Sequence, residues 1–303
     1  MVHKNLKEVR QHGNLSLPIS CYRIQPPFEN YDQLECHWHK EMELFKVVRG
    51  TMDIQCGSDY FGLKAGEMAF INSGELHAGR QTDGADMDYA AVVFSPEMLC
   101  GDQDDIVRVK YVAPVMDGRR SVQRVIGMET EREQAVQRGF DELMRLLQDG
   151  GPGYELLVRA KLLEVFAALA GEGENCRAER EKAPSQGIKN AIDYIRENYK
   201  NPLTIDELAG VGHMSAGHFC RLFKKYTFKT PVQYINGVRL SAAMDMLLRT
   251  DRKVLDIAFD AGFNSLSYFI GVFKESLGCT PTEFRRSGGS AVRGPADQGP
   301  EAL

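Results

Sequence analysis

The feature that most constrains the fold of this chain is an internal repeat between Thr204 and Arg286. From Gly212 and Gly262 onward the two copies match at an offset of 50 residues, and upstream they match at an offset of 49. A nearly constant offset of this length predicts two copies of one supersecondary unit. The matched pairs are Ala209 and Ala258, Gly212 and Gly262, Ser215 and Ser265, Phe219 and Phe269, Phe223 and Phe273, Lys224 and Lys274, and Thr230–Pro231 and Thr280–Pro281.

Each copy has the pattern of a helix-turn-helix. An apolar helical stretch, Ile205–Ala209 or Val254–Ala258, is followed by a turn that contains glycine. A second helix then begins at a serine and carries two phenylalanines four residues apart. A helix, a short turn with glycine and a second helix define this motif. Because the phenylalanines are expected to face the core, the opposite face of each second helix is left to contact a partner.

The segment AFDAGFNSLSYFIGVFKESLGCTPTEFR, from Ala258 to Arg285, resembles the C-terminal signature of the AraC/XylS family of bacterial transcription regulators. The resemblance extends over about 100 residues, Gln186 to Ser287. It implies a DNA-binding domain at residues 187–287, with two helix-turn-helix motifs joined by a long helix over Pro231–Leu248. It also implies promoter or operator DNA as a partner. Because activators dominate this family, it further implies activation of transcription through RNA polymerase.

Charge is unevenly divided along the 303 residues. Residues 187–287 hold 14 Lys/Arg and 10 Asp/Glu, a net charge of +4, whereas residues 1–186 hold 22 and 30, a net charge of −8. An acidic part joined to a basic part indicates that only the second part binds nucleic acid. The seven cysteines contain no Cys-x-x-Cys pair, which favours a cytoplasmic protein with reduced thiols. No apolar run approaches the roughly 18 residues that span a bilayer, so no membrane partner is expected.

Short strands that end in glycine-rich turns characterise residues 1–118. They are expected at Leu44–Arg49, Thr51–Cys56, Glu67–Ile71 and Tyr89–Phe94. Strands of this length and spacing predict a β-sandwich or β-barrel. The chain is therefore expected to be a multidomain α+β protein, with an N-terminal β-barrel and trailing helices before an all-α C-terminal domain. A further strand, broken by Pro114, is expected at Val107–Val115.

Three histidines and a glutamate within this β region resemble the cupin pattern: His37, His39, Glu43 and His77. Strand alternation places His37 and His39 on one face, with His77 on a neighbouring strand. Three imidazoles and a carboxylate are able to hold a divalent transition metal. The alternative is a metal-free pocket for a small-molecule effector, for which the resemblance favours a sugar, or a bracing role in the barrel. Asn72 lies where metal-binding cupins usually have proline.

The remaining segments are assigned by pattern. Apolar residues at helical spacing predict helices at Glu129–Leu147 and Tyr154–Leu169. Helices that follow a sensor barrel resemble the family's dimerisation segment, so residues 119–170 are expected to form a homodimer or, alternatively, only to cover the barrel. Residues 171–186 lack apolar rhythm and are expected to be a linker. A helix is expected at Gly187–Tyr199, and residues 288–303 form a tail that is expected to be disordered.

The exposed residues of the two second helices are the candidate DNA contacts. Arg221 lies where the family that this chain resembles uses arginine to reach a base edge, and arginine pairs bidentately with guanine. Lys224 and Lys225 are expected to bind phosphates or only to be solvated. Gly271 occupies the position of Arg221 in the second copy, which predicts that the first helix gives most of the base specificity. The full candidate set is Ser215, Gly217, His218, Arg221, Lys224, Lys225, Ser265, Ser267, Tyr268 and Lys274.

The leading functional hypothesis is a ligand-responsive, sequence-specific transcription regulator that is not an enzyme and needs no cofactor. Its effector would bind in the barrel at His37, His39, Glu43 and His77. The alternative is a metal-dependent cupin enzyme, such as an isomerase or dioxygenase, fused to a DNA-binding domain. That enzyme would need the same four residues to hold iron or manganese with an open coordination position.

Overall fold

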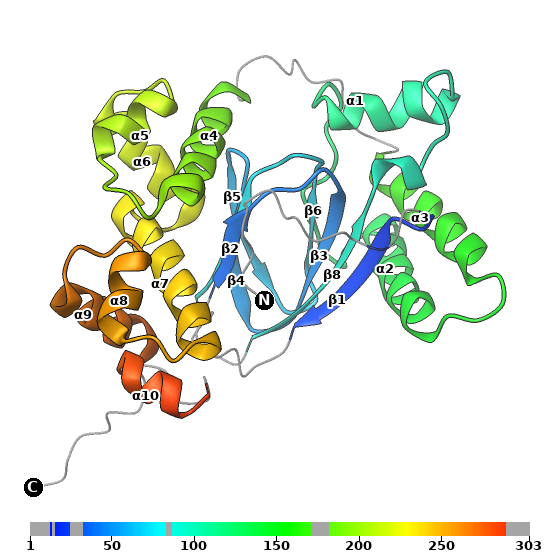
Figure 1. The fold of residues 1–303 in the computed structure, drawn as a ribbon. Coiled ribbons are helices and arrows are strands. Elements are labelled where there is room, and N and C mark those ends of the chain that lie inside the picture. The colour runs from blue at the N-terminus through cyan, green and yellow to red at the C-terminus, as the bar shows by residue number, and fades with distance from the viewer. Residues whose placement is uncertain (1–12, 14–15, 25–32, 83–86, 171–181, 289–303) are drawn as a thin grey trace, which may run out of the picture. The chain divides into compact units, whose positions relative to one another are not determined.

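The computed structural model describes residues 13, 16–24, 33–82, 87–170 and 182–288 (Figure 1). These residues divide into two compact units, with the division at Gln186. Most of the predicted linker at 171–186 and nearly all of the predicted tail at 288–303 lie outside the described residues. None of the helices in the described part is long and apolar enough to cross a membrane.

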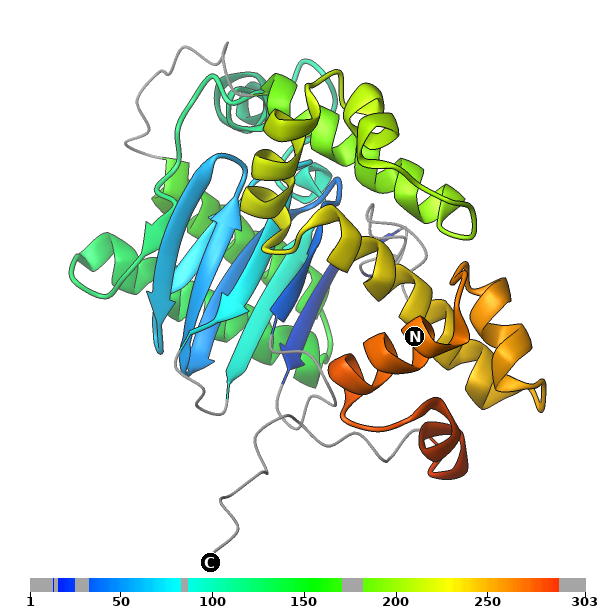
Figure 2. The ribbon, with the colours of Figure 1, turned by 90° about the vertical axis from the view of Figure 1, so that its left-hand side faces the viewer.

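The N-terminal unit contains two antiparallel sheets that face each other (Figure 1, Figure 2). The five-stranded sheet has the order β1, β8, β3, β6, β9, with bounds Ile19–Ile24, Asp88–Phe94, Met42–Arg49, Met68–Ile71 and Val125–Ile126. The four-stranded sheet has the order β2, β7, β4, β5, with bounds Gln33–His37, His77–Gln81, Thr51–Cys56 and Asp59–Lys64. The predicted sandwich or barrel is therefore a pair of stacked sheets.

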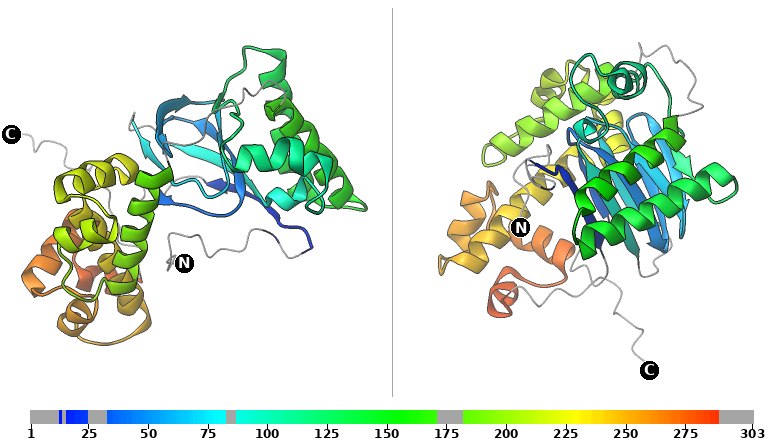
Figure 3. Two further views of the ribbon diagram at one scale, coloured as in Figure 1. Left: turned by 90° about the horizontal axis from the view of Figure 1, so that it is seen from above. Right: turned by 90° about the vertical axis from the view of Figure 1, so that its right-hand side faces the viewer.

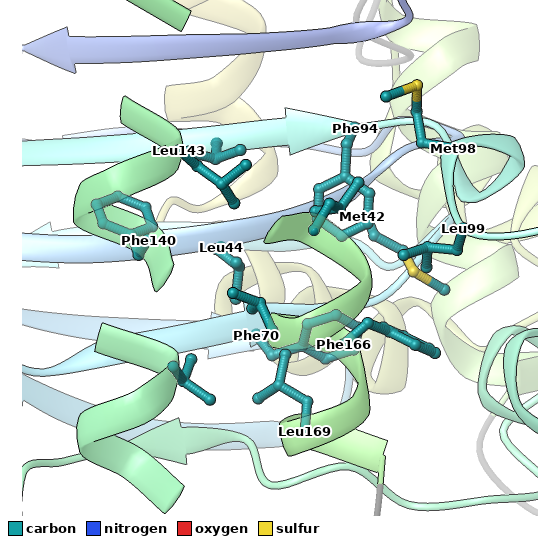
Figure 4. Close-up of a cluster of buried hydrophobic side chains, with 14 of the residues drawn as sticks. Met42, Leu44, Phe70, Phe94, Met98, Leu99, Phe140, Leu143, Phe166 and Leu169 are labelled. Carbon is teal, nitrogen blue, oxygen red and sulfur yellow. The ribbon is translucent and has the colours of Figure 1, made fainter. Parts of the chain in front are cut away.

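Both faces of the five-stranded sheet are buried. Leu44 on β3 belongs to a cluster shared with helices α2 (Glu131–Asp149) and α3 (Tyr154–Ala170), whereas Phe45 belongs to a cluster shared with β4 and β5. Figure 3 shows the two helices side by side across the sheet. Figure 4 shows Leu44, Phe70 and Phe140 in the layer between the helices and the sheet. A strand buried on both faces has apolar residues at successive positions, as β3 does. The helices therefore complete the core, which was one of the two roles expected for residues 119–170.

The strand expected at Val107–Val115 was wrong. A π-helix covers Arg108–Val112, and α1 follows at Ala113–Met116. Asp105 begins the turn, since its side chain accepts a hydrogen bond from Val107 N at 2.8 Å and its carbonyl accepts one from Val109 N at 2.9 Å. Pro114 is the second residue of α1, which continues directly from the π-helix. The last strand, β9, instead falls within the region that was expected to be helical.

The C-terminal unit is entirely helical in its described residues. Its helices are α4 (Lys182–Asn198), α5 (Ile205–Val211), α6 (Ala216–Thr227), α7 (Pro231–Arg249), α8 (Val254–Asp260), α9 (Leu266–Leu277) and α10 (Pro281–Arg286). Helix α4 begins five residues before the predicted start at Gly187. The repeated Thr-Pro pairs mark helix starts, because Thr230 and Thr280 each close a capping box and the proline follows at the first helical position.

The structure corrects the alignment of the repeat at its turns. Met214 N donates to Ala209 O at 2.9 Å, and Phe263 N donates to Ala258 O at 3.0 Å. These equivalent bonds extend the offset of 49 past the turn. The extra residue of the second copy is therefore Asn264, directly before the helix α9.

The glycines at the turns are consequently not equivalent. The left-handed position is filled by His213 (φ 54°) in the first copy and by Gly262 (φ 91°) in the second. Gly212 has φ −78° and ends α5. A Cβ on Gly262 would come within 2.5 Å of Tyr199 O, so this position requires glycine both for its conformation and for the close approach.

Candidate ligand site and candidate nucleic-acid interface

The four residues of the predicted ligand set lie together between the two sheets. His37 ends β2 and His77 begins β7, and the two residues are cross-strand partners. His39 follows two residues after β2, and Glu43 lies on β3 of the opposite sheet. His39, Glu43 and His77 are buried, His37 is half-buried, and one ligand atom from each lies within 4.8 Å of the others. Strand alternation was expected to bring His37 and His39 to one face, but only His37 lies on β2, and His39 reaches the site from the segment that follows the strand.

All three imidazoles are oriented by backbone carbonyls. His37 Nδ1 lies 2.7 Å from Glu35 O, His39 Nδ1 3.1 Å from Glu41 O, and His77 Nδ1 2.9 Å from Glu75 O. Because a carbonyl oxygen only accepts, each Nδ1 must donate. When such a ring is neutral, its Nε2 carries a lone pair. The three Nε2 atoms are therefore the groups available to a cation at the centre of the site.

The inward atoms approach one another closely. His37 Nε2 lies 3.0 Å from His77 Nε2, while Glu43 Oε2 lies 3.1 Å from His39 Nε2 and 3.5 Å from His77 Nε2. Burial raises the pKa of Glu43, but the hydrogen bonds and charges of the two imidazoles outweigh it and hold the pKa below its usual value. If all three imidazoles were neutral, their Nε2 atoms and the ionised carboxylate would face one another only as acceptors. Protons or a metal ion at the centre would resolve that arrangement.

Arg124 supports the loop that carries His77, and sequence reasoning did not find it. Its Nη1 lies 2.5 Å from Glu75 Oε2 and its Nη2 lies 2.9 Å from Glu75 Oε1. Its Nε donates to Asp59 Oδ2 at 3.1 Å, and Phe70 O accepts from Nη1 at 3.4 Å. Burial raises the pKa of Glu75, but the charge and hydrogen bonds of Arg124 outweigh this and lower it. Arg124 thus ties together both sheets and the loop before His77.

Asn72 belongs to the same loop. Its side-chain amide donates to Val115 O at 2.7 Å, and its carbonyl oxygen accepts from Ser73 N at 2.8 Å. Asparagine therefore anchors the loop to α1 at the place where metal-binding cupins usually have proline. The departure from the expected pattern leaves the four ligand residues in place.

Helix α6 presents the predicted DNA-contacting residues on one exposed face. Phe219 and Phe223 are fully buried, as expected from their spacing. The opposite face exposes Ser215, Gly217, His218, Arg221, Lys224 and Lys225. Two lysines in the last turn also complement the negative end of the helix dipole. Arg221 is placed to reach outward from a rigid helix, as base readout requires.

Helix α9 exposes a different chemistry at equivalent positions. Ser267, Tyr268 and Lys274 are exposed, while Ser265 is half-buried and its hydroxyl accepts a hydrogen bond from Tyr268 N. Gly271 is exposed at the position of Arg221. Glu275, which sequence reasoning overlooked, is exposed at the position of Lys225 and places a negative charge where the first copy has a positive one.

A unit with a polar site between two sheets, followed by a unit with two helix-turn-helix motifs, defines a DNA-binding protein with a ligand-binding domain. Comparison with known proteins makes this more specific. The family model of an AraC-like ligand-binding domain matches residues 20–166, and a helix-turn-helix domain model matches residues 208–287. The chain belongs to the AraC family of helix-turn-helix transcriptional regulators. The predicted family and the predicted mixed α+β fold are thereby confirmed.

Three relatives illustrate the match. The uncharacterized regulator in the cgkA 5' region of Pseudoalteromonas carrageenovora is 32% identical over 136 residues, which are 45% of this chain and 79% of that protein. The uncharacterized regulator YdeC of Bacillus subtilis is 24% identical over 287 residues, 94% of this chain and 98% of YdeC. The bifunctional transcriptional activator and DNA repair enzyme AdaA of Bacillus subtilis is 38% identical over 114 residues, 37% of this chain and 54% of AdaA.

Proposed function

We propose that this regulator binds a divalent transition-metal ion at His37, His39, Glu43 and His77, and that the ion is its effector. The observation that carries the proposal is the convergence of three carbonyl-oriented imidazoles and an ionised carboxylate on one buried point. Nitrogen ligands with one carboxylate suit first-row ions from manganese to zinc. Carbonyl partners that orient each ring are the usual support of metal-binding histidines.

The test is metal binding by the full-length protein. After chelation and dialysis, thermal melting is measured with manganese, iron, cobalt, nickel or zinc. An ion at about 100 times its Kd contributes about 2.7 kcal/mol to the stability of the folded protein. The variants His77→Ala and Glu43→Gln are expected to lose this shift, and the exposed His218→Ala is expected to keep it. Absence of stoichiometric metal, together with melting that no ion shifts, would rule out this effector class.

The same experiment separates the competing hypotheses. If a sugar raised the melting temperature and metal did not, the pocket would bind an organic effector, as first expected. The metal-dependent enzyme remains the second candidate, because its chemistry needs the same four ligands. AdaA is named as a repair enzyme as well as an activator, and this chain covers only about half of AdaA. Turnover of a substrate by the metal-loaded protein, lost in Glu43→Gln, would favour the enzyme over the regulator.

We further propose that the protein activates transcription in the cytoplasm as a homodimer that contacts RNA polymerase. Helix α3 supports the dimer. It buries Val158 and Leu162 against the sheet, yet Leu156 is 76% exposed, Leu157 56% and Leu163 37%. Residues seven apart, such as Leu156 and Leu163, lie on one helix face. These exposed leucines do not contribute to the core. We propose that a second copy of the chain packs against them.

Unequal DNA reading is the last element of the proposal. Helix α6 offers Arg221 and two lysines, whereas α9 offers Gly271, one lysine and a glutamate. Arginine reads base edges, and lysine mainly contacts phosphates. Helix α7, which joins the two helix-turn-helix motifs, is 19 residues long, about 28 Å at 1.5 Å per residue. We infer that α6 supplies most of the base specificity and that α9 mainly holds the DNA backbone.

A further inference from the structure

Tyr268 on α9 is held in place by residues from outside its own helix. Its side chain is 46% exposed, and its ring centroid lies 6.2 Å from that of the buried Phe263, in the turn between α8 and α9. Its hydroxyl oxygen lies 2.8 Å from Asn236 Nδ2 on α7, 32 residues earlier in the chain. The side chains of Ser267 and Lys274, also exposed on α9, make no hydrogen bond within the described part of the chain.

The bond between the two side chains fixes which group is the donor. An amide nitrogen only donates, so the hydroxyl oxygen of Tyr268 accepts the hydrogen bond from Asn236. The O–H of the tyrosine is therefore directed away from Asn236 and remains available as a donor. Among the residues that the structure describes, none accepts this proton. The pair thus presents one oriented O–H group at the surface of α9.

A positive charge lies close to this hydroxyl. Arg239, three residues after Asn236 on α7, interacts electrostatically with Tyr268. Its guanidinium donates from Nε to Tyr199 O at 2.8 Å and from Nη2 to Asn201 O at 2.9 Å. Both partners are neutral carbonyls, and no carboxylate in the described ranges forms an ion pair with Arg239. An anion is the acceptor that suits an O–H donor beside such a cation.

We propose that Tyr268 donates a hydrogen bond to a phosphate oxygen of the bound DNA, and that Asn236 is the positioning residue that orients its hydroxyl. The inference rests on the proposed role of α9, which is to hold the DNA backbone. Phosphates are the anions that DNA presents, and contacts to them fix the register of the protein without reading sequence. Asn236 acts only through the tyrosine and makes no base contact of its own.

The test is a double-mutant cycle on the full-length protein. Its affinity for a DNA fragment selected by its own binding is measured by fluorescence anisotropy. Tyr268→Phe removes the donor and is expected to weaken binding by about tenfold, as loss of a hydrogen bond to a charged acceptor does. Asn236→Ala leaves the hydroxyl free to rotate and is expected to weaken binding by about threefold. The double variant is expected to bind like Tyr268→Phe alone, because Asn236 acts through that hydroxyl.

Two further measurements separate orientation of the hydroxyl from packing of the helices. Asn236→Asp provides a carboxylate that accepts the tyrosine proton, so it is expected to weaken binding at least as much as Tyr268→Phe does. The DNA is also scanned with neutral methylphosphonate linkages, each of which removes the charge of one phosphate. One linkage is expected to weaken binding of the wild type but not of Tyr268→Phe.

Tyr194→Phe is the matched control, because it removes a hydroxyl of the same unit that bonds to Glu207. It is expected to bind DNA as the wild type does. The inference is overturned if Tyr268→Phe keeps wild-type affinity, or if its effect and that of Asn236→Ala are additive. It is also overturned if Tyr268→Phe alone changes base preference, which would make the tyrosine a base-reading residue. Failure of the proposed role of α9 has a different signature, because Lys274→Ala would then change base preference too.

Discussion

Replacement of Arg124 by methionine is expected to destabilise the N-terminal unit, because it leaves the carboxylate of Glu75 without its cation. Breaking a fully buried ion pair in this way costs about 3–5 kcal/mol. The Glu75 side chain is 18% exposed and that of Arg124 is 28% exposed, so water offsets part of the loss. We expect a cost of about 2–3 kcal/mol. At about 2–4 °C per kcal/mol for a unit of this size, the melting temperature should fall by roughly 4–12 °C.

The pH dependence identifies the cause. In the wild type the pKa of Glu75 is lowered, so its ion pair contributes stability above the unfolded carboxyl pKa, and this stability is lost as pH falls through the folded pKa. In Arg124→Met burial, which raises the pKa of Glu75, is opposed only by weaker causes such as the hydrogen bond from Asn72 N at 3.1 Å, so the charged form loses most of its stabilisation. The difference between wild type and variant should therefore be largest at pH 7 and should shrink toward pH 4.

The assay is calorimetry of the full-length protein, in which the two units can give separate transitions. Arg119→Met is the matched control, because Arg119 pairs with Asp117 at 2.9 Å but both side chains are more than half exposed. It should cost less than about 1 kcal/mol. The double variant Arg124→Met/Glu75→Gln should recover part of the loss. Equal effects of Arg119→Met and Arg124→Met, or a deficit that does not change with pH, would refute the reasoning.

Three further predictions address the helices. Gly139→Ala should lower the free energy of unfolding by about 1–3 kcal/mol, because the added Cβ would lie 2.2 Å from Val165 Cγ2. Gly237→Ala on α7 is the contrasting change, because its Cβ would have no atom within 4 Å. It should raise the free energy of unfolding, measured in urea, by about 0.5–1 kcal/mol. Arg221→Ala should relax base preference in a binding-site selection, and Lys274→Ala should weaken binding to all sequences alike; equal relaxation by both would contradict unequal reading. Leu156→Asp/Leu163→Asp should convert a dimer to a monomer in analytical ultracentrifugation, and an unchanged mass would exclude α3 as the interface.

The sequence predicted those parts of the molecule that depend on local periodicity. Phenylalanines four apart place Phe219, Phe223, Phe269 and Phe273 in the core, and pairing of β2 with β7 brings His37 opposite His77. The two sheets could be expected from short strands between glycine turns. In each case the pattern repeats within a few residues, so no long-range information is needed.

The support of the site could not be predicted in the same way. Glu75 and Arg124 are 49 residues apart in the sequence and meet only because β6 and β9 pair. The segment at Val107–Val115 was misassigned because Val-Lys-Tyr-Val alternates like a strand, while its conformation is set by a cap from Asp105. The slip in the repeat at Asn264 became visible only through hydrogen bonds at the two turns.

The internal repeat separates the requirements of folding from those of function. The positions that agree between the copies, such as Phe219 and Phe269, are buried and have the same role in each helix pair. The positions that differ most in chemistry, Arg221 against Gly271 and Gly210 against Phe259, are exposed. Since folding places weak demands on exposed positions, the differences there require another cause. For Arg221 on α6, the cause we propose is base reading, which Gly271 on α9 has no side chain to perform.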